Sequence, residues 1–176
     1  STFNALTKVG TGITLSTDGD VYATGVGTFS GGLHIPDYIH HVGDNNCKFG
    51  FESGDTFAIE TAGSERLRID SSGRLLLGTT DIDSISSGEV SKLIIKGTNS
   101  TASASFTRHS ADASGTGMYF GKSRNATIGS NTIVQSGDEL GRVTFSGDDG
   151  TDINSMAARI QAFVDGTPGT NDMPGR

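Results

Sequence analysis

The chain has 176 residues, of which 33% are hydrophobic and 26 are glycine, and its formal net charge is −7. An acidic balance without clustered Lys or Arg argues against nucleic acid as a partner. The single cysteine, Cys47, excludes an intramolecular disulfide framework, and no apolar run approaches the roughly 20 residues that span a bilayer.

The apolar residues occur in short alternating runs, which favours β-structure over disorder. Because there are so few of them, we expect the chain to complete its core with other copies of itself. The first ten residues lack the basic start and apolar stretch of a signal peptide. The chain begins without Met and stops in a turn-like sequence, so we expect it to be part of a longer protein.

The first predicted element is a hairpin, with strands at 13–15 and 21–23. Asp18-Gly19 lies between them and supplies the positive φ that tight hairpin turns need. Further short elements follow: strands at 33–35, 38–39 and 47–51, and a turn at 44–46.

The clearest element is a three-stranded meander over 57–79, FAIETAGSERLRIDSSGRLLLGT. Apolar and polar residues alternate in it, and Gly and Ser break it twice, as in half-buried strands joined by tight turns. The unit at 13–23 aligns with 67–77 without a gap, and a looser copy starts at Val143. This recurrence predicts a modular array.

A polar connector at 81–88 divides the chain into a predicted N-terminal module, 1–80, and a second β-rich module, 89–176, truncated at its C-terminus. The second module has one region that fits either strand or loop, 99–105. Its predicted strands are 93–96, 106–109, 118–121, 127–128 and 140–146, followed by a turn at 147–150. The segment 156–164 fits both a strand and a helix face, and the β-rich surroundings favour a strand.

No motif predicts a catalytic, cofactor or metal site. The histidines lack further ligands at metal spacing, although three copies of His40 or His41 on a threefold axis would be one way to bind a metal. The acidic run at 148–152 lacks the pattern of a calcium loop, so its aspartates are better explained as turn formers. The four histidines are His34, His40, His41 and His109, and the other acidic pair is Asp81 and Asp83.

The meander carries charged residues that we also considered for chemistry. Glu60, Glu65 and Asp70 are conceivable paired carboxylates for glycoside hydrolysis, but the chain has no Trp and few aromatic platforms for sugar. Arg66 and Arg68 are expected on one side of a strand, opposite Leu67 and Ile69, where they would pair with Glu60, Asp70 or a neighbouring chain. We therefore predict that the chain is not an enzyme and has no cofactor.

The run at 60–73, ETAGSERLRIDSSG, followed by 75–80, resembles a segment of bacteriophage tail-fibre and related virion proteins, with those of marine and cyanobacterial phages the nearest. This chain differs from them in having Leu-Leu-Leu at 75–77 where the family has a glycine-containing run. The stretches 137–145, 149–150 and 165–176 are similar to repeat-like blocks of long phage fibres.

The resemblance implies an all-β protein of short hairpins and meanders in an elongated, intertwined homotrimeric fibre. The expected function is a structural component of a bacteriophage virion that takes part in host attachment. The expected partners are two more copies of the chain, other virion proteins of the tail or adaptor, and a host surface glycan or protein; nucleic acid and membrane insertion are not expected. Leu67, Ile69, Leu75 and Leu77 are the predicted inter-chain core.

Three other functions remain open at this point. A receptor-binding or glycan-binding module would use the few exposed aromatic candidates, Tyr22, Tyr38, Tyr119 and Phe120. A depolymerase tailspike would need a carboxylate pair and regular β-helix rungs. A bacterial surface adhesin is the third alternative.

Overall fold

The computed structural model describes residues 13–15, 21–23, 31–85, 89–100 and 102–176. The chain divides into two units, Ser1–Pro36 and Asp37–Arg176. In the first, β1 (Ile13–Leu15) pairs antiparallel with β2 (Val21–Ala23), as the sequence predicts, while the turn between them lies outside the described residues. The stretch 33–35, predicted as a strand, forms none.

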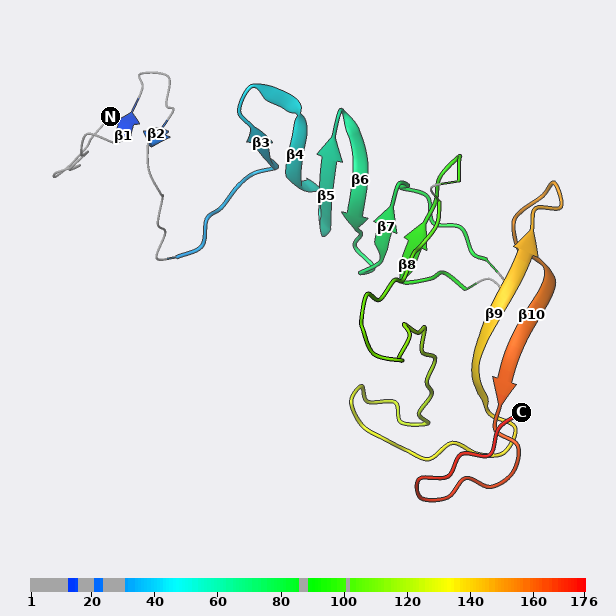
Figure 1. Ribbon diagram of the computed structural model, residues 1–176. Helices are drawn as coiled ribbons and strands as arrows, with labels where there is room; N and C mark the ends of the chain where they lie inside the picture. The colour runs from blue at the N-terminus through cyan, green and yellow to red at the C-terminus, as the bar shows by residue number, and fades with distance from the viewer. Residues whose placement is uncertain (1–12, 16–20, 24–30, 86–88, 101) are drawn as a thin grey trace. The chain divides into compact units, whose positions relative to one another are not determined.

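The second unit contains a six-stranded sheet in the order β3-β4-β5-β6-β7-β8 (Figure 1). The first five of these strands form an antiparallel meander, and β8 pairs parallel to β7. The strands are β3 (Tyr38–His41), β4 (Asp44–Ser53), β5 (Thr56–Thr61), β6 (Ser64–Ile69), β7 (Leu75–Leu77) and β8 (Leu93–Ile95). The meander predicted over 57–79 is therefore confirmed as β5, β6 and β7.

Local turn chemistry explains where these strands end. Ala62 and Gly63 have φ of 52° and 68° and make the tight turn between β5 and β6. Between β6 and β7, one carboxylate oxygen of Asp70 accepts hydrogen bonds from the backbone N–H groups of Ser72 (2.9 Å) and Arg74 (3.0 Å).

One turn was predicted to begin two residues too late. The turn expected at 44–46 falls instead at 42–43, where Gly43 has a φ of 81°. Asp44 then begins β4, and its carboxylate accepts a hydrogen bond from the N–H of Asn46 (3.1 Å). Turn-forming residue types are here accommodated at the start of a strand, because glycine takes the positive φ.

A long hairpin follows, made of β9 (Glu139–Gly147) and β10 (Ser155–Phe163), which pair antiparallel with two register shifts. The segment 156–164, for which helix and strand both fitted the sequence, is therefore almost entirely strand. At the base of the hairpin Val164 is buried, and its backbone exchanges hydrogen bonds with Gly137 (2.8 Å) and Asp138 (2.9 Å).

The described residues contain no helix, and strands make up 38% of them. The all-β fold of short hairpins and meanders is thus confirmed. The predicted strands at 106–109, 118–121 and 127–128 are absent, as these residues have no strand partner. The predicted module boundaries remain a prediction; in the structure, β7 and β8 on either side of the 81–88 connector belong to one sheet.

Candidate interaction surface

One face of the six-stranded sheet carries two rows of apolar side chains. Residues directly opposite each other on paired strands point to the same side, and so do residues two apart on one strand. The observed register therefore places two rows of side chains on this side, each running across the strands. We call them together the apolar face: Ile39, Phe49, Ile59, Leu67, Leu77 and Ile95 in one row, and Phe51, Phe57, Ile69, Leu75 and Leu93 in the other.

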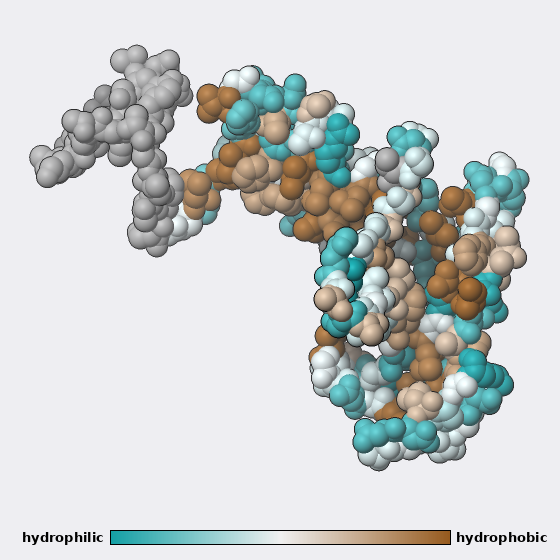
Figure 2. Space-filling view, viewed as in Figure 1, coloured by the Kyte–Doolittle hydropathy of each residue, from teal (hydrophilic) through white to brown (hydrophobic). Residues whose placement is uncertain are grey.

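The apolar face is not covered by its own chain. Phe49, Phe51, Ile69 and Leu93 keep 44%, 48%, 46% and 55% of their surface exposed. The ring of Phe57 joins the first two, at centroid distances of 6.3 Å from Phe49 and 6.0 Å from Phe51. Figure 2 shows hydrophobic residues gathered over the β3–β6 part of the sheet. Burying one such side chain contributes about 1.5–3 kcal/mol, so the face holds a large unused driving force for association.

The other face of the sheet carries the buried residues. Ala58, Leu76 and Ile94 are at most 9% exposed, and they share that side with Arg68. Lys96, two residues after Ile94, forms an ion pair with Asp83 of the β7–β8 connection. That ion pair joins the connection to this side of the sheet.

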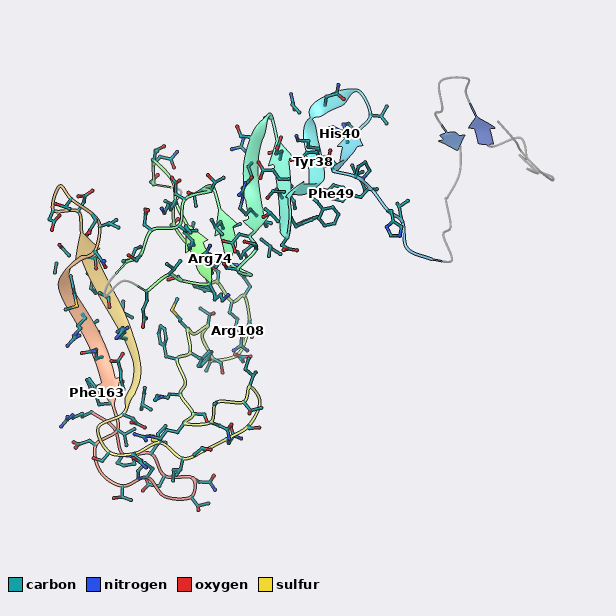
Figure 3. The ribbon with its side chains drawn as sticks, turned by 180° about the vertical axis from the view of Figure 1, so that it is seen from behind. Tyr38, His40, Phe49, Arg74, Arg108 and Phe163 are labelled. Carbon is teal, nitrogen blue, oxygen red and sulfur yellow. The ribbon has the colours of Figure 1, made fainter. Side chains whose placement is uncertain are left out.

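Charged residues surround this small core. Lys48 pairs with Glu60 (3.3 Å) and lies 3.8 Å from the centre of the Tyr38 ring, at the β3 end of the sheet (Figure 3). Arg68 pairs with Glu65 (2.6 Å) and also with Glu52. We call this side the polar face. Its pairs are partly exposed, and each contributes little to stability.

Glu60 and Asp70, the partners predicted for the two arginines within the chain, were wrong; pairing with a neighbouring chain stays a prediction. Arg68 binds Glu65 and Glu52, while Arg66 donates from Nε to the Thr61 hydroxyl (3.1 Å). Glu60 is taken by Lys48. A register shift after Ile59 leaves Arg66 without a residue opposite it on β5. Arg68, by contrast, lies opposite Ala58 in the regular part of the ladder. The predicted opposition of Arg68 to Leu67 and Ile69 is confirmed.

The ion pairs have the expected effect on titration. The hydrogen bond between Glu65 and Arg68 lowers the pKa of Glu65 and raises the pKa of Arg68. Desolvation acts to raise the pKa of Asp70, but hydrogen bonds from Arg74 and Ser72 outweigh it and lower that pKa. All three groups are therefore charged at neutral pH, and none has the raised carboxyl pKa of a general acid.

The acidic run at 148–152 forms turns. Asp148 accepts a hydrogen bond from the N–H of Gly150 (2.7 Å), and Asp152 accepts one from Asn154 (2.7 Å). Asp149 accepts from the N–H of Thr151 (2.9 Å) and from the Ser155 hydroxyl (2.7 Å). Among the described residues, no group of three or more His, Cys, Asp or Glu side chains is placed to hold a metal ion. The four histidines are exposed.

The β9–β10 hairpin carries a second exposed apolar side. Val143 faces Ile160 and Phe145 faces Ala158, with Val143, Ile160 and Phe145 exposed by 41%, 68% and 53%. Phe120 rests on this hairpin so closely that a Cβ on Gly141 would lie 2.5 Å from the Cβ of Phe120.

The aromatic candidates for receptor binding do not come together. Tyr38 is engaged with Lys48, and the edge of its ring meets His40 at 6.0 Å between centroids. Tyr119 is 90% exposed and Phe120 55%. The side chain of Tyr22 lies outside the described residues.

The inter-chain core predicted from the sequence remains a prediction, but the structure shows which face its residues share. Leu67, Ile69, Leu75 and Leu77 all lie on the apolar face. The sequence interpretation missed seven further members: Ile39, Phe49, Phe51, Phe57, Ile59, Leu93 and Ile95. The alternation at 47–51 and 57–59 was a usable signal for four of them, because it continues the same period-2 pattern across β4 and β5.

Comparisons of the chain with protein families, with curated proteins and with solved structures found no match. Within its described residues, no helix has the length and apolar character needed to cross a membrane.

Proposed function

We propose that this chain is a structural segment of a bacteriophage virion fibre, a tail fibre or another fibre of the particle, which takes part in host attachment. It acts as a homotrimer whose three apolar faces form a shared core. The observation that carries this proposal is the apolar face: eleven apolar side chains follow the register across all six strands, and several are about half exposed in a single chain.

The distribution of buried residues supports self-assembly. In the described part of the chain the buried hydrophobic residues are Ala58, Leu76, Ile94, Val134 and Val164. Such a core is small for a chain of 176 residues, since stability normally depends on extensive apolar burial. Identical chains that pool their apolar faces around an axis would supply the missing burial by symmetry.

The resemblance to phage fibres supports the identity of the assembly and the number of its chains. Its residues 64–69 form β6, and 70–73 form the turn into β7, so the similar segment builds the middle of the sheet. A dimer would also cover an apolar face, as two sheets packed in a sandwich. The choice of three chains rests on the resemblance.

The proposal is tested on purified particles of a phage whose genome encodes the chain. Mass spectrometry of purified particles should detect it, and gold-labelled antibodies against it should mark a fibre in electron micrographs. Absence of the chain from purified particles would refute the virion role. Negative-stain images of the isolated chain should show elongated particles, and compact monomers would refute the assembly.

A further inference from the structure

The segment 103–121 makes almost no backbone hydrogen bonds to other described residues. Before it, the N–H of Ala102 donates to the carbonyl of Asn99; after it, the N–H of Arg124 donates to the carbonyl of Thr132. Inside it, and counting described residues alone, only the N–H groups of Asp112 and Ser114 are bonded, both to side chains. Every residue of the segment is exposed.

The residue pattern of this segment is nevertheless that of strands. Phe106, Met118 and Phe120 are exposed by 57%, 62% and 55%. Phe106 lies between Ser105 and Thr107, and Tyr119 separates Met118 from Phe120. Between the two apolar stretches, Asp112 accepts a hydrogen bond from the N–H of Ser114 (2.9 Å), which is an Asx turn. Two strand-like arms therefore flank a turn, but the arms do not pair with each other.

A long connection of this kind is unusual within a self-sufficient domain. β8 ends at Ile95 and β9 begins at Glu139, and no strand lies between them among the described residues. Loops longer than about 12–15 residues without secondary structure are uncommon in compact domains and generally have a function or act as linkers. A row of unpaired N–H and C=O groups next to exposed apolar side chains is a template for strand pairing.

The same chain presents the complementary edges. β8 is the last strand of its sheet, and β9 and β10 form a sheet of two strands. In the described structure the outer edges of β8 and β9 have no strand partner, and that of β10 is bonded only at its end, where Phe163 pairs with Arg176. A two-stranded hairpin alone is marginally stable, and the exposed side of β9 and β10 needs a cover. Unpaired segments and unpaired edges on one molecule make it complementary to its own copies.

We infer that residues 103–109 and 117–121 are inter-chain strands, which pair along the open strand edges of neighbouring copies of this chain. The inference rests on the proposed homotrimer and deepens it: β3–β8 form their ladder within one chain, whereas the following region is intertwined. The occupant of these edges is a second copy of the chain.

The first test is amide hydrogen exchange on the assembled chain, read by mass spectrometry. Amides in 103–109 and 117–121 should exchange at least about 100-fold more slowly than in an unstructured peptide, because ladder hydrogen bonds protect them. Exchange at the peptide rate in an assembly that sediments as a trimer would overturn the inference and leave the proposed function standing. A folded monomer would instead refute the proposed function.

Proline substitution supplies the second test, with a matched control. Proline removes an N–H, and neighbouring N–H groups of a strand point to opposite edges. Ala104→Pro and Thr107→Pro remove N–H groups of opposite parity, so at least one should lower the melting temperature of the assembly by several degrees. Ala113→Pro makes the same change as Ala104→Pro, but in the turn, and should leave the melting temperature unaltered. Equal melting of all three variants and the parent would overturn the inference.

Discussion

The six-stranded sheet and the region after β8 differ in which interactions a single chain provides for them. The sheet joins its six strands by backbone pairing within one chain but leaves its apolar face uncovered. Among the described residues, the segment 103–121 leaves its backbone without strand pairing, and its apolar side chains are exposed, although Phe120 contacts β9. Backbone pairing and apolar burial are thus separate requirements, and a chain built for assembly can satisfy one locally while leaving the other to its copies. We expect the sheet to associate through its face and the later region through its edges.

The largest effect should come from a charge in the apolar face. Ile69→Asp or Leu67→Asp places a carboxylate where three chains meet, and burying an unpaired charge costs several kcal/mol per site. Sedimentation should show that either variant dissociates into monomers. Ile69 is the sharper probe because it is 46% exposed in one chain, so the monomer should tolerate the change. An intact trimer carrying either substitution would show that the chains meet elsewhere.

Two neighbouring residues of β3 provide the matched pair for this prediction. Ile39 lies on the apolar face and His40 on the polar face, and both are exposed in the single chain. Ile39→Asp should weaken the assembly, whereas His40→Asp, which adds an acid near Lys48, should not. Equal dissociation constants for the two variants would remove the distinction between the faces.

The second prediction concerns the integrity of the sheet itself. A Cβ on Gly50 would lie 2.1 Å from the carbonyl oxygen of Asp37, which accepts a hydrogen bond from the N–H of Phe51 (2.7 Å). Gly50→Ala should therefore push β3 from β4 and destabilise the fold by about 1–3 kcal/mol in a denaturant titration. Gly54→Ala, which meets nothing within 4 Å, is the control and should change stability by less than about 0.5 kcal/mol. Similar stabilities would contradict this account of the β3–β4 contact.

A glycine-to-alanine substitution in β9 should change the stability of the fold by the same amount as Gly50→Ala or by less. Gly141→Ala displaces Phe120 from β9, with an expected loss of about 1–3 kcal/mol. Gly147→Ala, on the same strand with open space around it, should be close to neutral. If Gly141→Ala is equally neutral, Phe120 does not hold its segment on the hairpin.

The smallest effect is a pH dependence at the base of the hairpin. The Asp138 carboxylate accepts two hydrogen bonds from Arg124, both of 2.7 Å, and one from the N–H of Gln135 (3.0 Å). These bonds, led by that of Arg124, hold the pKa of Asp138 well below its usual range. A lowered carboxyl pKa stabilises the fold above the ordinary value of about 3.9, and the contribution is lost as the pH falls below it.

Asp138→Asn removes this titration. The melting temperature of the parent should therefore fall more steeply below about pH 4 than that of the variant, and the two should be parallel at higher pH. The difference between the curves isolates Asp138 from other carboxyl groups with a lowered pKa, such as Asp70 and Asp149. Parallel curves over the whole range would show that this ion pair does not contribute.

Features that depend on neighbours in sequence were predictable. Alternation and Gly or Ser turns located β5, β6 and β7, because both signals act within a few residues. The parallel pairing of β7 with β8 was not predicted, since no local pattern specifies which strand meets another across a long connection. The binding of Arg68 to Glu52 was missed for the same reason: it depends on the β4–β5–β6 register.

The strands predicted at 106–109 and 118–121 show that a local residue pattern alone does not produce a strand. Their residue pattern is that of strands, but a strand exists only with a partner, and none of the described residues pairs with them. Likewise, alternation located part of the apolar face, but only the register showed that eleven side chains share one side. If the proposed assembly is correct, these predicted strands are a property of the trimer.

Sedimentation equilibrium of the purified chain tests the central claim most directly. Our account predicts one species with three times the 18.2 kDa mass of the chain, and its dissociation by Ile69→Asp. A folded, stable monomer of 18.2 kDa at micromolar concentration would contradict it, because the apolar face would then be stable in water without a partner.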